Sequence, residues 1–257
     1  MIKITPLFSG SKGNCTLVQT DKTNVLLDIG YGYKQIISEL AERGLTPKDI
    51  NGIIITHEHT DHIAALPLWT RSCATGVYSP KNIADYICQR TYCSDITEVS
   101  GDFTFEDVNV STYECSHDAR QCLGYRFSDG KDSVACVTDT GIADDKLIDF
   151  LLPCKTVFIE SNHDVNMLRN GPYPYPLKQR IFSPYGHLSN TQTAEVLNKI
   201  VDGHVQNIVL AHLSEQNNTK ELAFTTAVEA LKTRGIVEGK DVNVYVADQY
   251  KNRIAIC

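Results

Sequence analysis

The chain has 257 residues, of which 42% are hydrophobic, and a formal net charge of −7. This size and composition are typical of a globular protein with a sizeable core, and no stretch approaches the roughly 18 apolar residues of a membrane span. The negative charge argues against a surface that attracts nucleic acid everywhere. It leaves room for a local basic channel and for bound metal ions, which the count omits.

The N-terminal sequence and the cysteines both favour a cytoplasmic location. Residues 1–7 lack the apolar core and small-residue cleavage site of a secretory signal. The nine cysteines are odd in number, are scattered from Cys15 to Cys257 and form no Cys-x-x-Cys pair. A disulfide framework or a structural zinc site is therefore not expected, and most of the thiols should be small buried groups.

The first part of the chain is predicted to begin with strands and continue with helices. Apolar runs separated by turn residues predict strands at residues 2–8, 15–18 and 25–28. Apolar positions on one helical face follow from Ile36 to Ala41, and Gly44 provides a stop. Further helix starts are predicted at Thr46-Pro47 and Ser79-Pro80, where a hydroxyl side chain precedes a proline.

The second part is predicted to be rich in strands and then to alternate with helices again. The expected strands begin at Phe103 and cover residues 108–113, 122–127 and 133–137, and the expected helices lie near residues 142–150, 191–200 and 219–233. This order indicates an α/β class with much antiparallel sheet. No low-complexity linker interrupts the chain, so we expect one domain over residues 1–257.

A turn-rich segment at residues 170–176, Asn-Gly-Pro-Tyr-Pro-Tyr-Pro, is predicted to be a loop. It could be a rigid crossing on the surface, or a loop over the active site that contacts phosphate and stacks on a base or sugar. Under the second interpretation the residues near the substrate are Arg169, Tyr173, Tyr175, Lys178 and Arg180. A solvated face is the alternative for the same residues.

The most informative motif is Thr-His-Glu-His-Thr-Asp-His at residues 56–62, between two apolar runs. His57 and His59 are two apart on an extended segment, so they point to the same side and can bind one ion. Asp61 and His62 then supply a second. Imidazole with carboxylate suits zinc, manganese or iron, so the motif predicts part of a site for two divalent ions. A solvated polar loop is the alternative.

The remaining ligands are expected where other apolar runs give way to polar residues. His117, Asp139 and His212 each occupy such a position, from which a side chain can project into a shared cleft. Asp28 ends an early predicted strand and is expected to orient a ligating imidazole. A plain turn at the end of the strand is the alternative role for Asp28.

Taken in chain order, the candidate ligands and Asp28 resemble the ligand set of the metallo-β-lactamase-fold hydrolases. The ligands are His57, His59, Asp61, His62, His117, Asp139 and His212. The resemblance implies a four-layer αββα sandwich with metal ions at one edge. It implies one ion at His57, His59 and His117, a second at Asp61, His62 and His212, and Asp139 between them. An aspartate at 139 disfavours the true β-lactamases, and a histidine at 59 disfavours the flavodiiron branch, which carries glutamate there.

Four further segments, residues 8–15, 160–164, 186–190 and 212–218, resemble the WalJ/YycJ group of bacterial metallohydrolases. That group is described as DNA exonucleases acting from the 5′ end, associated with WalK/WalR signalling and related to ribonuclease Z and ribonuclease J. The resemblance covers nearly the whole chain. It implies a DNA substrate, with RNA also open.

The predicted reaction is hydrolysis of a phosphodiester by a metal-bridging hydroxide, with Asp61 as the base. His187, oriented by Glu160, resembles the acid of ribonuclease Z, although it could instead satisfy a backbone carbonyl group. His163 has both a catalytic-edge and a structural interpretation. His204 has no motif around it and is expected to be exposed.

Two other functions stay open from the sequence. A small-molecule hydrolase acting on a thioester, lactone or cyclic phosphodiester would use the same metals. A non-enzymatic adaptor that binds a signalling partner would not need seven ligands placed for open coordination, so the intact ligand set argues against it.

Overall fold

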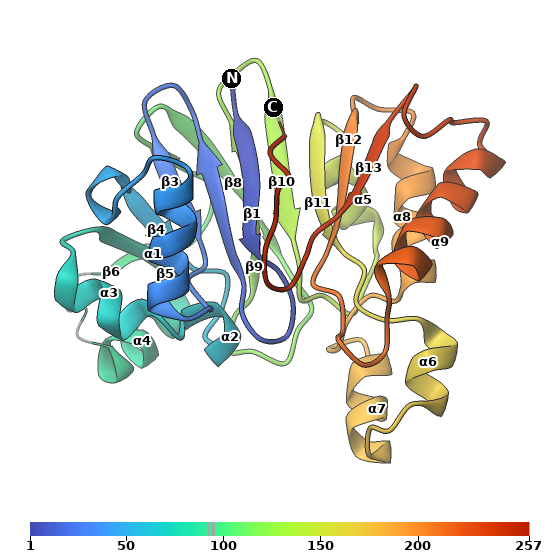
Figure 1. Ribbon diagram of the computed structural model, residues 1–257, viewed down its shortest axis with the longest axis horizontal. Coiled ribbons are helices and arrows are strands. Elements are labelled where there is room, and N and C mark those ends of the chain that lie inside the picture. The colour runs from blue at the N-terminus through green and yellow to red at the C-terminus, as the bar shows by residue number, and fades with distance from the viewer. Residues whose placement is uncertain (92, 94–95, 257) are drawn as a thin grey trace.

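The computed structural model describes residues 1–91, 93 and 96–256, which form two β-sheets packed face to face (Figure 1). The first sheet has the order β1 (Lys3–Phe8), β2 (Cys15–Gln19), β3 (Asn24–Leu27), β4 (Gly52–Ile54), β5 (Gly76–Pro80) and β6 (Ile96–Val99). The second has the order β13 (Asn243–Val246), β12 (Asn207–Ala211), β11 (Thr156–Glu160), β10 (Ser133–Val137), β9 (Leu123–Ser128), β8 (Val108–Glu114) and β7 (Phe103–Phe105).

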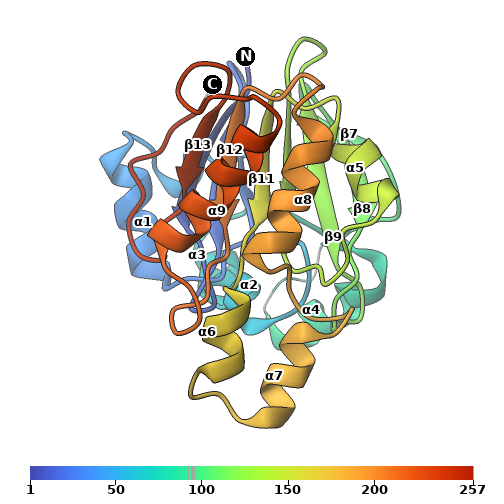
Figure 2. The same cartoon turned by 90° about the vertical axis from the view of Figure 1, so that its right-hand side faces the viewer.

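Helices cover the outer face of each sheet, so the predicted four-layer αββα sandwich is confirmed (Figures 1 and 2). On the first sheet these are α1 (Tyr33–Glu42), α3 (Leu66–Ser72) and α4 (Ala84–Arg90), with the short α2 (Thr60–Ile63) at its end. On the second they are α5 (Asp145–Leu151), α8 (Asn190–Ile200) and α9 (Lys220–Thr233). Two more helices, α6 (Val165–Asn170) and α7 (Tyr175–Phe182), project beyond the second sheet. None of the described helices is long and apolar enough to span a bilayer.

Alternation of side chains along the strands creates the core on both sides of each sheet. Ile53 and Ile55 face the helical layer, where they belong to one cluster with Trp69. Ile54 lies between the sheets in the same cluster as Tyr125 of β9. Each such side chain contributes roughly 1.5–3 kcal/mol when it leaves water. This apolar packing fixes the strands whose ends carry the polar residues described below.

Parallel pairing brings several polar loops to the same end of the sandwich. β3, β4 and β5 run parallel in the first sheet, and β10 to β13 run parallel in the second. The carboxyl ends of parallel strands lie at one edge of a sheet. The loop after β4, which carries residues 56–62, therefore lies at the end where α2, α6 and α7 are found (Figure 1).

Most predicted elements are present with small shifts at their ends, but one prediction near a proline is wrong in detail. Ser79-Pro80 ends β5, and the helical turn begins only at Lys81, because Pro80 still has extended backbone angles. The helix start predicted at Thr46-Pro47 is confirmed, and it opens a 3₁₀ helix over Pro47–Asp49 with Thr46 as its N-cap.

The loop predicted at residues 170–176 is present but shorter than expected. Only the stretch between Asn170 and Tyr175 is a turn, and Pro176 lies in the first turn of α7. Proline fits there because the first N–H groups of a helix have no helical acceptor. The segment is therefore the connection of a helical hairpin.

Candidate metal centre

Six imidazoles converge with acidic side chains at the end of the sandwich where the parallel strands terminate. Atoms capable of binding a metal form four groups, each within 4.8 Å: His57, His59 and His117; His57, His62 and Asp139; Asp61, His62 and His212; and Asp139, Glu160, His187 and His212. All seven residues expected as ligands lie in these groups. Several of them line a cavity of about 220 Å³.

The carboxylate of Asp28 fixes the orientation of the His62 ring. One carboxylate oxygen lies 2.8 Å from Nδ1 of His62, and the other accepts a hydrogen bond of 2.8 Å from the backbone N–H of Thr56. His62 therefore keeps its Nδ1 proton, and its Nε2, which lies 3.1 Å from Nδ2 of Asn14 and 3.4 Å from Oδ2 of Asp139, faces the other candidate ligands. Burial lowers the pKa of His62, but the negative charges of Asp28 and Asp139 outweigh it and raise the pKa to about 9.

Glu160 is fully buried and connects two histidines. Its Oε1 lies 2.8 Å from Nδ1 of His187 and 2.7 Å from Nδ1 of His212. Its Oε2 accepts hydrogen bonds from the backbone N–H groups of Leu188, at 3.0 Å, and Thr140, at 3.2 Å. Burial raises the pKa of Glu160, but the charge and hydrogen bonds of the histidines hold it well below its ordinary value. The carboxylate is therefore ionised and fixes the orientation of both rings.

His57, His59 and His117 form the opposite side of the centre. Nδ1 of His57 lies 3.0 Å from Oγ1 of Thr56. Nδ1 of His117 lies 3.3 Å from a backbone carbonyl oxygen, and its Nε2 is 3.9 Å from Oδ1 of Asp139. The ring of His59 is 4.6 Å from that of His57 and 5.1 Å from that of His117, measured between centroids. Burial first, and then the neighbouring histidines, lower the pKa of His57, so it is the neutral ligand form.

Unsatisfied buried atoms at the centre fit a divalent cation. Within the described part of the chain, Nε2 of His57, Nε2 of His212 and Oδ2 of Asp139 are buried without a hydrogen-bond partner. Each such atom costs about 1–3 kcal/mol if nothing satisfies it. Coordination would satisfy all three, and imidazole with carboxylate suits zinc, manganese or iron. These residues can therefore hold divalent metal ions.

Two site residues are fixed by the turn at residues 8–15, a role that sequence analysis missed. The backbone N–H of Asn14 donates to the carbonyl oxygen of Asp61 at 2.8 Å, and Oγ of Ser9 accepts from the backbone N–H of His212 at 2.9 Å. The sequence signal was a polar turn between two apolar runs, but it gave no indication of these distant partners. The turn thus links the two halves of the site.

The residues expected to contact substrate fall into two groups. Tyr173 and Arg180 line the metal cavity, and Arg180 forms a two-point ion pair with Asp118, with Nη2 2.9 Å from Oδ1. The second group consists of Arg169, Tyr175 and Lys178. These residues line a separate groove on the outer side of the helical hairpin and are not part of the lining of the metal cavity.

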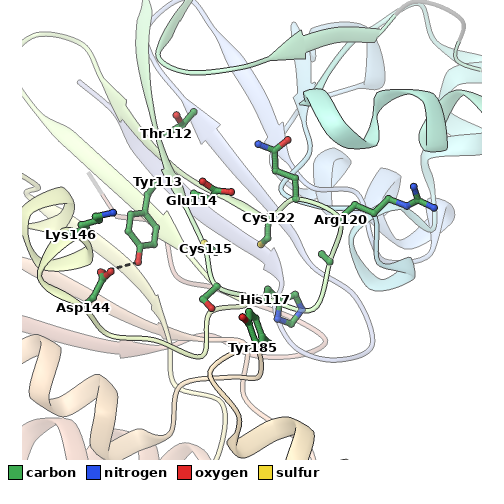
Figure 3. Close-up of a pocket in the computed structure, with 13 residues that line it drawn as sticks. Thr112, Tyr113, Glu114, Cys115, His117, Arg120, Cys122, Asp144, Lys146 and Tyr185 are labelled. Carbon is green, nitrogen blue, oxygen red and sulfur yellow. Dashed lines mark hydrogen bonds between the residues drawn. The ribbon is translucent and has the colours of Figure 1, made fainter.

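A larger cavity, of about 570 Å³, is also lined by His117 (Figure 3). Figure 3 shows Lys146 and Asp144 at one side of it and Arg120 at the other, with Tyr185 close to His117. Both acidic and basic side chains thus line its walls. His117 lines both this cavity and the metal cavity.

His163 lies outside the metal cavity. It is 1% exposed, and neither ring nitrogen has a hydrogen-bond partner among the described residues. Its ring packs edge-on against Phe182, with 5.3 Å between the centroids. Burial lowers the pKa of His163 to about 4. The structural interpretation therefore fits its surroundings better, and His204 is exposed as expected.

The depressed pKa of His163 predicts a loss of stability in mild acid. The imidazole titrates at 6.5 in the unfolded chain but at about 4 in the fold, so below pH 6.5 only the unfolded state takes up the proton. The contribution is complete above pH 6.5 and decreases as the pH falls towards 4. Urea denaturation should show wild type losing about 2 kcal/mol more than His163→Leu between pH 7.5 and pH 5. Equal losses would contradict this role.

Comparison with known proteins shows similarity over most of the chain. Residues 9–212 match the family model of the metallo-beta-lactamase superfamily. The chain is 36% identical over 250 residues to exodeoxyribonuclease WalJ of Streptococcus pneumoniae serotype 2, covering 95% of this chain and 93% of that one. It is 34% identical over 250 residues to exodeoxyribonuclease YycJ of Bacillus anthracis, covering 94% of both. The metallo-beta-lactamase fold protein YhfI of Bacillus subtilis shares the fold, with a TM-score of 0.76, 16% identity and 99% of each chain covered.

Proposed function

Because the chain belongs to the metallo-beta-lactamase superfamily, and within it to the WalJ/YycJ group, we propose that this metal-dependent hydrolase is a DNA exonuclease acting from the 5′ end. One structural observation supports it most: the unsatisfied atoms of His57, Asp139 and His212 belong to overlapping groups of potential metal ligands, and Asp139 and His212 line the cavity there. Relatives named exodeoxyribonucleases align over nearly the whole chain, which favours a phosphodiester as the substrate.

The proposal includes two divalent ions, zinc, manganese or iron. One would be held by His57, His59 and His117, the other by Asp61, His62 and His212, with Asp139 between them. When bound, such ions lower the pKa of water and neutralise charge that develops on phosphoryl oxygens. The grouping of these residues into overlapping clusters supports this division.

Asp61 is the proposed base. Its Oδ2 lies 3.7 Å from Nε2 of His62 and 3.9 Å from Nε2 of His212, and its side chain is 28% exposed, so water can reach it. Burial raises the pKa of Asp61, but the nearby imidazoles of His212 and His62 outweigh it and hold the pKa below its ordinary value. The ionised carboxylate can accept and pass on the proton of the attacking water.

His187 is the proposed acid for the leaving oxygen. Its ring lines the metal cavity, while Nδ1 is held 2.8 Å from Glu160. Glu160 thus keeps the Nδ1 proton in place and leaves Nε2 for the leaving group. This contact favours the acid over the alternative in which His187 only satisfies a backbone carbonyl group.

Further parts of the proposal come from the resemblance to the WalJ/YycJ group. Residues 1–257 would act as one catalytic domain in the cytoplasm, where the DNA is. RNA would be a second substrate, and the enzyme would be functionally linked to a WalK/WalR two-component system. A deletion strain whose WalR-dependent transcription is unchanged would argue against that link.

The proposed function predicts stepwise digestion of end-labelled DNA by protein of known metal content. A 3′-labelled strand should give a ladder of shorter products, whereas a 5′ label should be released at once as a mononucleotide. A chelator should abolish both, zinc or manganese should restore them, and activity should fall steeply with salt because phosphate contacts release counterions. Parallel single-stranded, duplex and RNA substrates define the strand preference.

Other results would favour the alternative functions. Turnover of a thioester, lactone or cyclic phosphodiester without any polynucleotide product would indicate a small-molecule hydrolase. Failure to bind metal or hydrolyse either substrate class would indicate an adaptor.

A further inference from the structure

The helical hairpin formed by α6 and α7 projects from the sandwich at the end that carries the metal centre (Figures 1 and 2). Residues 165–194, which include it, contain no aspartate or glutamate but three lysines and arginines, in a chain with 31 acidic and 24 basic residues. The hairpin is thus a positively charged segment of an acidic protein. Local charge of this kind attracts polyanions even when the net charge does not.

The two sides of α7 face different cavities. Leu177 and Ile181, four residues apart, line the metal cavity together with Tyr173 and Arg180. Tyr175, Lys178, Gln179 and Phe182 have the spacing of another helical face, and with Arg169 they line the outer groove, of about 550 Å³. A strand whose phosphodiester lies at the metal centre therefore needs only to cross this one helix to enter the outer groove.

The outer groove combines exposed aromatic rings with free positive charge. Tyr175 is 70% exposed and Phe182 45% exposed. Arg180 is paired with Asp118, but no carboxylate of the described residues lies within ion-pair distance of Arg169 or Lys178. Nζ of Lys178 lies 2.9 Å from the carbonyl oxygen of Arg169, so the ammonium group is held near the α6 end of the groove.

Aromatic rings alternating with cations are suited to an unpaired polynucleotide. Bases stack on the rings and phosphates contact the cations, without dependence on sequence. Bases in the interior of a duplex have both faces covered by neighbouring pairs, so they cannot stack on Tyr175. The aromatic part of the groove therefore favours single-stranded over double-stranded DNA.

We propose that the outer groove of the α6–α7 hairpin binds an unpaired DNA segment next to the phosphodiester held at the metal centre. This inference rests on the proposed nuclease function and adds to it a platform for single-stranded DNA. One base stacks on Tyr175 and another on Phe182, while Arg169 and Lys178 contact the phosphates between them.

The test measures binding of metal-loaded protein to fluorescent, phosphorothioate-linked oligothymidylate and to a blunt duplex with the same linkages. Tyr175→Ala should weaken single-strand binding about five- to tenfold and duplex binding much less, because it removes a stacking surface. Tyr175→Phe should retain the binding, since it keeps the ring and loses only the hydroxyl that accepts a hydrogen bond from Gln179. Lys178→Ala should reduce the slope of log K against log salt by about 0.7 for single strands.

The exposed Lys240, on a distant turn, provides the charge-matched control, and Lys240→Ala should change neither affinity nor the salt slope. Equal weakening of single-strand and duplex binding by Tyr175→Ala, or no weakening, would overturn the proposal. Digestion of end-labelled DNA by the wild-type protein distinguishes failure of the groove proposal from failure of the proposed nuclease function. If wild type digests DNA while Tyr175→Ala binds single strands normally, only the platform fails. If wild type neither binds nor digests DNA, the nuclease function fails as well.

Discussion

Asp61→Asn is expected to lower the rate of DNA hydrolysis by about a thousandfold while the protein stays folded. General base catalysis contributes roughly 10²- to 10⁴-fold, and an amide cannot accept the proton of the attacking water. The fold should tolerate the change because the backbone carbonyl group of Asp61, which accepts from Asn14, is unaffected and the side chain is partly exposed. Single-turnover digestion of 3′-labelled DNA measures the effect.

Measuring the metal content of the variant distinguishes a role of Asp61 as metal ligand from its role as general base. If Asp61 served only as a ligand, saturating metal would restore the rate of the variant. If it is the base, the deficit should persist at full occupancy, as measured by elemental analysis of the same samples. Asp145→Asn, which alters a carboxylate that is 95% exposed on α5, is the matched control and should keep the wild-type rate. Turnover of Asp61→Asn near that of wild type would exclude Asp61 as the base.

The position of the metal centre could be predicted because each expected ligand follows a recognisable apolar strand. His117, Asp139 and His212 stand just beyond β8, β10 and β12, and parallel or neighbouring strands deliver such residues to one edge. The periodicity of the strands predicted the α/β class, whereas the four-layer sandwich was implied by the resemblance to the metallo-β-lactamase-fold hydrolases.

The fine geometry of the site could not be predicted, because it depends on contacts between distant segments. Asp28, Asp139 and His212 have left-handed φ values of 59°, 59° and 55°, which cost roughly 1–2 kcal/mol each and have no local sequence signal. A Cβ atom at Gly30 would lie 1.6 Å from the carbonyl oxygen of Asp61, a close approach that only the folded chain reveals.

The helical hairpin was missed for a different reason. Pro172, Pro174 and Pro176 indicated a continuous turn, whereas Pro174 is the residue before α7 and Pro176 lies in its first turn. Proline is compatible with both positions. Among the described residues of α7, Ile181 is also the one that is buried, so hydrophobic periodicity gave little indication of a helix.

Glu160→Gln is expected to reduce both stability and activity, because all four groups around the carboxylate are hydrogen-bond donors. These are Nδ1 of His187, Nδ1 of His212 and the backbone N–H groups of Thr140 and Leu188. In either orientation the amide NH₂ group would face two of these donors. Two buried unsatisfied donors cost about 3 kcal/mol in total, which urea denaturation at pH 7 should detect. DNA hydrolysis should fall by about a hundredfold.

The pH dependence and the metal content of Glu160→Gln identify the origin of these losses. The pKa of Glu160 in the fold lies below the unfolded value of 4.5, so its charge stabilises the fold above pH 4.5 and this contribution decreases as the pH falls further. The stability difference between Glu160→Gln and wild type should therefore shrink in acid, whereas Glu195→Gln, on the exposed side of α8, should show no difference at any pH.

The metal content of Glu160→Gln identifies which histidine carries the effect on activity. A variant that keeps its metal but loses rate would indicate that Glu160 acts through His187. Loss of metal would indicate that it acts through His212, and unchanged rate and stability would exclude both roles.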